Sequence, residues 1–131
     1  MKFLVIICTA IVLVSCGGGK SGGSINKDTK SDFVMEQDKM KALDTAADFE
    51  AAQKPYKGKI IEMKGYITAA KKNVTSAEPN TWVFHLSPTA TEEGASYTIC
   101  HTDTDPTGSI GKQFTVKGKY DGFSLNDSVF Y

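Results

Sequence analysis

In the C-terminal part of the chain, apolar residues recur at every second position. The segment 113–120 is the plainest case, because Phe114, Val116 and Tyr120 alternate with polar residues that include Lys117. A period of two places successive side chains on opposite faces of a β-strand. We therefore expect a strand here, with Phe114, Val116 and Tyr120 directed toward a core and Lys117 directed toward solvent.

The same alternation marks four further segments. Strands are expected at 59–68, 81–86, 96–101 and 128–131, separated by loops at 70–80, 87–95 and 103–111. The residues of the first two strands that share a core phase are Ile61, Met63, Gly65, Ile67, Trp82, Phe84 and Leu86. A glycine inside a strand, such as Gly65, often marks a bulge or a tight bend. Asp121-Gly122 is a strong turn signal before the last strand.

Five strands at this spacing predict a mainly β domain. An open sheet of five strands would leave two edges exposed, whereas a closed barrel leaves none. Glycines in the first and fourth strands suit the bends that closure needs. We therefore expect a small five-stranded barrel.

A helical segment is expected before the strands. Its apolar positions are Met35, Met40, Leu43, Ala47 and Ala51, with Ala46 and Phe49 widening the stripe. Ser31 or Asp32 can cap its start, and Pro55 ends the pattern. Asp44 is a weak helix former, so the helix is expected to break near it into two shorter pieces.

Two glycine-containing motifs and one cysteine motif resemble a known family. The segment 56–67, the segment 111–122 and Thr98-x-Cys100 are similar to the tRNA anticodon-binding-like OB-fold domains of bacterial lipoproteins. The resemblance covers residues 43–131 and implies a five-stranded OB-fold barrel preceded by an N-terminal helix. It also implies that Thr98 and Cys100 face inward. The family name refers to nucleic acid only because of the similarity in fold, and a fold alone does not determine a function.

The N-terminus has the order of a lipoprotein signal. A basic start at Met1-Lys2 precedes an apolar run over 3–14, and Leu13-Val14-Ser15-Cys16 resembles a bacterial lipobox. The run is about a dozen residues long, shorter than the roughly 20 that a spanning helix needs. We expect a signal peptide at 1–15, lipidation at Cys16, a Gly/Ser-rich tether at 16–30, and the OB-fold domain with its helix at 31–131.

This reading implies a location and a class of partner. The lipid on Cys16 would anchor the protein in the bacterial cell envelope, and Gly17 stands where an aspartate retains many lipoproteins in the inner membrane. We therefore expect the outer membrane, with the domain facing the periplasm or the exterior. The 15 basic and 15 acidic side chains balance, so the charge excess that drives nucleic-acid binding is absent. A protein, peptide or glycan is the expected partner.

No catalytic motif stands out. Cys100 is the one cysteine beyond Cys16, and as a nucleophile it would need His85 or His101 as its base. It lies in the middle of an apolar strand, where cysteine usually packs as a small hydrophobic residue. We therefore expect a binding module rather than an enzyme, with no catalytic residue, metal ion or cofactor.

A metal-dependent sensor or enzyme is the alternative. His85, His101 and Asp103 would be its three ligands if the folded chain brought them together. A calcium-loop pattern is also partly matched, by Asp103, Asp105, Thr107 and Gly108 at positions 1, 3, 5 and 6. Its position 12 carries Phe114 in place of the bidentate glutamate, which favours an ordinary turn.

The ligand face of an OB fold is formed by its second and third strands with the first and last loops. The candidate binding residues are His85, Tyr97 and His101 on the strands, flanked by Lys71 and Lys72 on one side and Phe123 on the other. Val83, Ile99, Asn73, Ser124 and Asn126 lie beside them. The phase of the third strand stays open. If Thr98 and Cys100 face inward, Tyr97 and His101 join His85 outside; with the opposite phase, the outer face is merely polar.

Overall fold

The computed structural model describes residues 24–73, 81–91 and 97–131. The expected signal peptide, Cys16 and parts of two expected loops lie outside these residues. The elements are β1 (Phe33–Val34), α1 (Gln37–Asp44), α2 (Phe49–Gln53), β2 (Ile60–Lys72), β3 (Trp82–Ser87), β4 (Thr98–Thr102), the 3-10 helix η1 (Thr107–Ser109), β5 (Gln113–Tyr120) and β6 (Ser124–Phe130).

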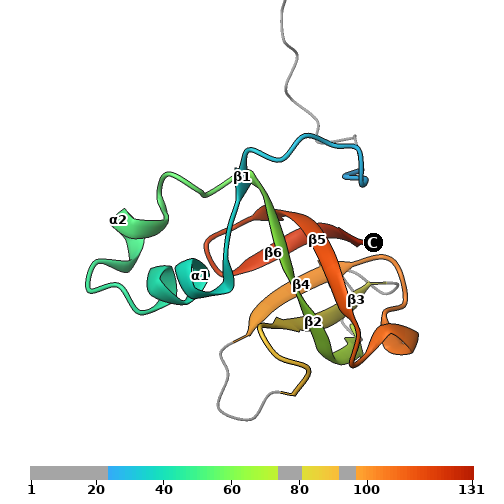
Figure 1. Ribbon diagram of the computed structural model, residues 1–131. Coiled ribbons are helices and arrows are strands. Elements are labelled where there is room, and N and C mark those ends of the chain that lie inside the picture. Colours follow the sequence, from blue (N-terminus) through green and yellow to red (C-terminus); the bar gives the residue numbers. More distant parts are fainter. Residues whose placement is uncertain (1–23, 74–80, 92–96) are drawn as a thin grey trace, which may run out of the picture.

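Five strands close into a barrel, as the alternation predicts (Figure 1). The hydrogen-bonded order is β1-β2-β3-β4-β6-β5, and a further pairing of β2 with β5 completes the ring. Neighbours in the ring are antiparallel except β4 and β6, which run parallel. The domain is mainly β with short helices before the barrel, and this small mixed barrel is consistent with an OB-like fold.

Strand β2 serves both sides of the barrel because its pairing partner changes along its length. Its first part pairs with β5 and its second part with β3, with Tyr66 paired to both. Next to this changeover, a Cβ atom on Gly65 would lie 2.6 Å from Gln37 Nε2 and 2.8 Å from the Ser87 carbonyl oxygen. Only glycine fits at such a close approach.

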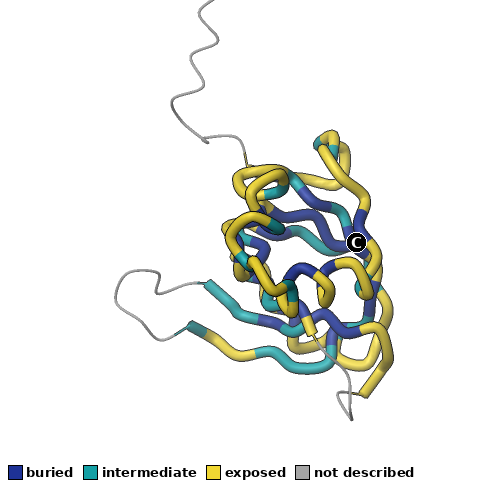
Figure 2. Tube along the Cα trace, turned by 90° about the vertical axis from the view of Figure 1, so that its left-hand side faces the viewer, coloured by how far each residue is buried: buried dark blue, intermediate teal, exposed yellow. Residues whose placement is uncertain are grey.

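The barrel interior holds the residues that the alternation places there (Figure 2). Ile61, Met63, Ile67, Phe84, Leu86, Val116 and Tyr120 are each at most 1% exposed. Thr98 and Cys100 of β4 are also buried, so the inward phase implied by the family pattern is confirmed. Trp82 and Phe114 share the core phase but are half-buried, since they lie at or near the start of their strands.

The expectation that Lys117 faces solvent is wrong. Its side chain does lie on the outer face of β5, but Lys117 is only 7% exposed. Its Nζ donates hydrogen bonds to the backbone carbonyl oxygens of Lys27 and Thr29 and lies 3.5 Å from the Glu62 carboxylate. The N-terminal residues 25–32, which we call the strap, therefore cover this part of the barrel, and Ile25 is buried with them.

The expected start of the helical segment at Ser31 or Asp32 is also wrong. The chain is extended there, because Asp32 N donates to the Ile60 carbonyl oxygen and Met35 N donates to that of Glu62. These bonds add β1 to the edge of β2 as a parallel strand. Tertiary hydrogen bonding thus overrides the local helical pattern.

The rest of the helical segment follows the prediction in outline. Helix α1 begins after Glu36 and ends at Asp44, so the expected break near Asp44 is confirmed. Met40 and Leu43 face the core, whereas Ala47 and Ala51 are exposed. Figure 1 shows α1 and α2 together on one side of the barrel, and η1 on the other.

Two strands are longer than the sequence pattern indicates. β2 continues to Lys72, although a loop was expected from residue 70. β6 begins at Ser124 rather than at Ser128, because Ser124 and Leu125 pair with Ile99 and Cys100 of β4. The polar Asn126-Asp127 inside β6 resembles a turn, and Asp127 does take a positive φ of 50° without ending the strand.

Candidate ligand-binding face

The outer surface of β2, β3 and β4 carries two rows of side chains at right angles to the strands. In the first row, Ala69 pairs with His85, which pairs with Ile99. In the second row, Lys71 pairs with Val83, which pairs with His101. These six residues lie on the face opposite the core phase, since their neighbours Phe84, Cys100 and Thr102 point inward. We call these six residues and Tyr97 the β2–β4 face.

Tyr97 and His85 form an aromatic contact on this face. Their rings stack with centroids 3.9 Å apart and planes inclined by 8°. Tyr97 is nevertheless 43% exposed, so the outer side of this pair is open to a partner. Stacking restricts both rings before any ligand arrives, which lowers the entropic cost of binding.

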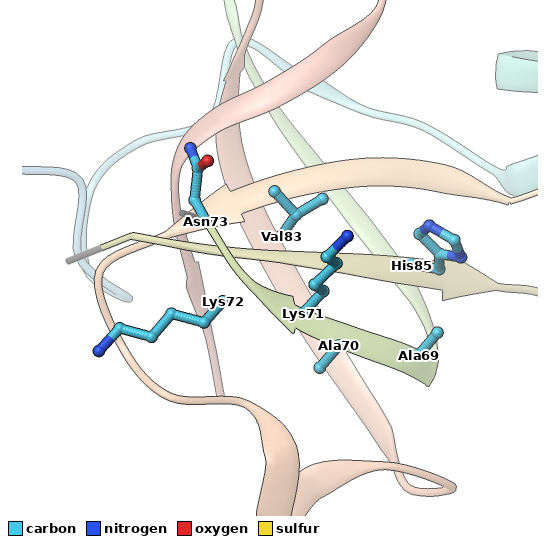
Figure 3. A pocket seen from close by; sticks show the side chains of 7 residues that line it. All are labelled: Ala69, Ala70, Lys71, Lys72, Asn73, Val83 and His85. Atoms are coloured by element: carbon cyan, nitrogen blue, oxygen red, sulfur yellow. The ribbon is translucent and has the colours of Figure 1, made fainter. Parts of the chain in front are cut away.

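A shallow hollow of about 520 Å³ adjoins the stacked pair (Figure 3). It is lined by Ala69, Ala70, Lys71, Lys72, Asn73, Val83 and His85. Lys71 extends on the side of Val83 and His85, whereas Lys72 extends away from them. Successive residues of a strand point to opposite faces, so Lys72 takes the inward phase, like its pairing partner Trp82. Lys72 is nevertheless exposed, because it lies at the end of the barrel.

The β2–β4 face is basic and apolar in character. Its ionisable groups are the Lys71 ammonium, the two imidazoles and the Tyr97 phenol, and none of its seven residues is acidic. Ala69, Val83 and Ile99 supply the apolar floor between them. Such a surface suits a ligand that has an apolar or planar part and a negatively polarised group.

The structure brings together some of the predicted binding residues but not all. Lys71, His85, Tyr97 and His101 share the β2–β4 face. Lys72 lines the hollow but does not belong to the face: it lies near the carboxylate of Asp105, at the end of the barrel, and contributes to the lowered pKa of that group after the hydrogen bonds from Thr107. Phe123 contacts the ring of Phe49 on α2, with centroids 5.5 Å apart, and lines a different hollow.

Sequence reasoning missed one part of this face. Ala69 lies beyond the expected strand 59–68 and is not among the predicted binding residues. A register shift of β2 between Ile67 and Ala69 moves Ala69 and Lys71 to the outer surface. Nothing in the local sequence marks that bulge.

The position of Cys100 argues against a catalytic role. Its side chain is fully buried and its Sγ donates to the Thr98 carbonyl oxygen over 3.8 Å. Burial raises the pKa of the Cys100 thiol far above its usual range, which removes the reactive thiolate. His85 and His101, its expected bases, are on the opposite face of their strands.

The acidic residues after β4 form a turn. Asp105 Oδ1 accepts hydrogen bonds from Thr107 N over 2.9 Å and Thr107 Oγ1 over 2.7 Å. Asp103 Oδ1 accepts from Thr104 Oγ1. Within residues 24–73, 81–91 and 97–131, no group of three or more His, Cys, Asp or Glu side chains is arranged to hold a metal ion.

Comparisons with known proteins do not name a ligand. The chain matches no protein-family model, no curated protein and no solved structure. In the part of the chain that the structure describes, no helix has both the length and the apolar character needed to cross a bilayer.

Proposed function

We propose that this protein is a lipid-anchored cell-envelope protein whose barrel captures a partner on the β2–β4 face. The anchor rests on Leu13-Val14-Ser15-Cys16, in which the cysteine sulfur takes the lipid. Gly17 after it is compatible with export to the outer membrane. The partner is a protein, peptide or glycan, because the balanced charge of the chain gives no general attraction to nucleic acid.

The stacked pair of Tyr97 and His85 is the observation that carries the proposal. A tyrosine that is 43% exposed yet held at 3.9 Å against an imidazole offers a large rigid surface with a polar tip. Tyrosine is enriched among the residues that dominate binding energy, because it contributes contact area at low entropic cost. Lys71 and His101 in the adjacent row would then orient the polar groups of the partner.

The charges of this face favour a partner with acidic groups. Lys71 is exposed and positively charged, and none of the seven residues of the face is acidic, so the face attracts a negatively charged group. Capture of an acidic partner is then stronger at low than at high ionic strength. A partner that binds through apolar contacts alone would show no such dependence.

The test compares Tyr97→Ala with Tyr131→Ala, since Tyr131 is a similarly exposed tyrosine, at 45%, on the C-terminal residue after β6. Partners are cross-linked to the wild-type protein in intact cells, identified, purified and titrated against the three purified full chains. We expect Tyr97→Ala to weaken binding by about tenfold or more, as for a central aromatic contact, and Tyr131→Ala to leave it unchanged. Equal affinity of wild type and Tyr97→Ala, with both folded, would place binding elsewhere.

A further inference from the structure

A second hollow lies between α2 and the turn that joins β5 to β6. Its volume is about 670 Å³, and it is lined by Asp48, Phe49, Glu50, Ala51, Gln53, Lys54, Lys57 and Phe123. We call it the α2 hollow. It shares no residue with the hollow beside Lys71, so a ligand here is independent of the function proposed above.

Gln53 is the unusual residue of the α2 hollow. It is only 3% exposed, and its amide Nε2 has no hydrogen-bond partner within the described residues. Buried polar groups are nearly always paired, because an unpaired donor loses its bonds to water without replacement. The last torsion of a glutamine side chain is broad, so rotation of the amide can present this donor to the hollow.

The ammonium of Lys57 approaches the same place. A Cβ atom on Gly122 would lie 3.0 Å from Gln53 Oε1 and 3.8 Å from Lys57 Nζ. Gly122 has a φ of +106°, a conformation that side-chain-bearing residues rarely adopt. The glycine therefore leaves room beside the Gln53 amide oxygen and the Lys57 ammonium group. When the amide is turned over, the Nε2 donor takes the place of that oxygen, and the two donors together match a carboxylate.

Two phenylalanines form the apolar wall of the hollow. The rings of Phe49 and Phe123 are 5.5 Å apart with planes inclined by 42°. Phe123 is 72% exposed, the second highest value among the exposed large apolar residues that the structure describes. Phe49 is half-buried beneath it. An aromatic pair that is open on one side, next to a polar recess, is a usual composition for a small-molecule site.

We propose that the α2 hollow binds a small carboxylic acid with an apolar body. The carboxylate accepts hydrogen bonds from Gln53 Nε2 and Lys57 Nζ above Gly122, and the apolar body lies against Phe49 and Phe123. Lys54 adds a second positive charge to the lining.

The two acidic residues that line the hollow do not fill the position proposed for the ligand's carboxylate. Asp48 Oδ1 already accepts the Ala51 backbone N–H over 3.1 Å and caps α2. Glu50 lies on the first turn of α2, whereas Gln53 is its last residue and Lys57 follows the helix. The positive charge is thus concentrated at the end of the hollow where the amide lies.

The test follows the Gln53 side-chain amide by NMR in the isotopically labelled full chain at pH 7. The probe is 3-phenylpropionate, with 3-phenylpropionamide and acetate as controls for the apolar body and the charge. We expect a saturable shift of the Gln53 amide signals with 3-phenylpropionate, and affinity lower by roughly fivefold or more for each control. No saturable shift of these signals with 3-phenylpropionate would overturn the proposal.

Variants separate the site from the fold. Lys57→Gln removes the charge and Phe123→Ala removes an exposed ring, so both should fold as wild type does and weaken 3-phenylpropionate roughly fivefold or more. Gln53→Leu should reduce the preference for the carboxylate over the amide, because Lys57 remains, while keeping or raising the melting temperature, because it removes an unpaired buried donor. Unchanged affinity in Lys57→Gln and Phe123→Ala would show that the probe binds elsewhere.

Discussion

Lys117 Nζ donates a hydrogen bond to the Thr29 backbone carbonyl oxygen over 2.8 Å, joining residues 88 positions apart. The same ammonium also bonds the Lys27 carbonyl oxygen and lies 5.6 Å from the centre of the Tyr131 ring. A single lysine thus ties the strap, a barrel strand and the C-terminal residue together. Desolvation alone would lower the pKa of Lys117, but the contacts with Tyr131 and Glu62 outweigh it and raise that pKa.

Replacing Lys117 is expected to release the strap. Lys117→Met keeps most of the side-chain volume but removes all donors to Lys27 and Thr29. The urea midpoint of unfolding should fall, and backbone amides of residues 25–32 should exchange faster with solvent. Lys119→Met, an exposed position on the same strand, is the control and should change stability by less than about 0.5 kcal/mol. Equal midpoints for the two variants would show that the strap contributes nothing to the fold.

Asp121 is expected to make stability depend on acid. Its Oδ1 accepts from Phe123 N and Ser124 N, each over 2.8 Å, and its Oδ2 accepts from Asn126 Nδ2 over 2.8 Å and from Ser124 Oγ. Partial burial would raise the pKa of Asp121, but these hydrogen bonds prevail and lower it.

A folded-state pKa below the unfolded value stabilises the fold at pH values above the unfolded pKa. This contribution is lost as the pH falls through the folded value. Urea unfolding from pH 6 to pH 2 should therefore show a loss of stability below about pH 4. The Asp121→Asn variant should be less stable at pH 6 and should lose less stability on acidification. A wild-type curve parallel to that of the variant would argue against this role.

Val116 tests the closure of the barrel. It is 0% exposed on the inner face of β5, so Val116→Asp places an unpaired charge in a small core. We expect a loss of about 3–5 kcal/mol, enough to unfold a domain of ordinary stability, seen as a lost thermal transition by circular dichroism. Lys119→Asp is the matched surface control on the same strand and should retain the transition.

Lipid attachment can be tested at Cys16. Cys16→Ser removes the only atom that can carry the acyl group, so the protein should leave the membrane fraction or remain unprocessed. Cys8→Ser is the control, because Cys8 lies inside the apolar run of the signal and should be removed with it. Mass spectrometry of the mature N-terminus reads out both variants. A Cys16→Ser protein that is processed and membrane-bound like wild type would contradict the lipoprotein interpretation.

Strand β5 shows what local pattern can predict. Its bounds, Gln113–Tyr120, equal those read from the alternation, because every second residue must enter the core of a closed barrel. The burial of Lys117 in the same strand could not be predicted, since it depends on carbonyl groups of the strap about 90 residues earlier in the chain. Alternation tells which face a side chain takes but not what covers that face.

The candidate site also contains a part that the sequence predicts and a part that it does not. His85, Tyr97 and His101 followed from strand phase and the topology of the fold, and they do share one face. Phe123 was assigned to that face because it lies in the last loop, yet its ring packs on Phe49. That contact joins α2 to the β5–β6 turn. The position of a helix around a barrel cannot be predicted from the periodicity of the sequence. Gln53 was missed for the same reason.

If the protein is anchored at Cys16 as we propose, the strap also limits how far the barrel can move away from a bilayer. With Ile25 buried and Thr29 bonded to Lys117, the nine residue steps from Cys16 to Ile25 are all that separates the proposed lipid from the docked chain. Fully extended, they span at most about 32 Å, comparable to the width of the domain itself. An anchored domain of this kind searches a thin layer along the surface, so partners embedded in or lying on the same membrane meet it at a far higher local concentration than partners in the bulk.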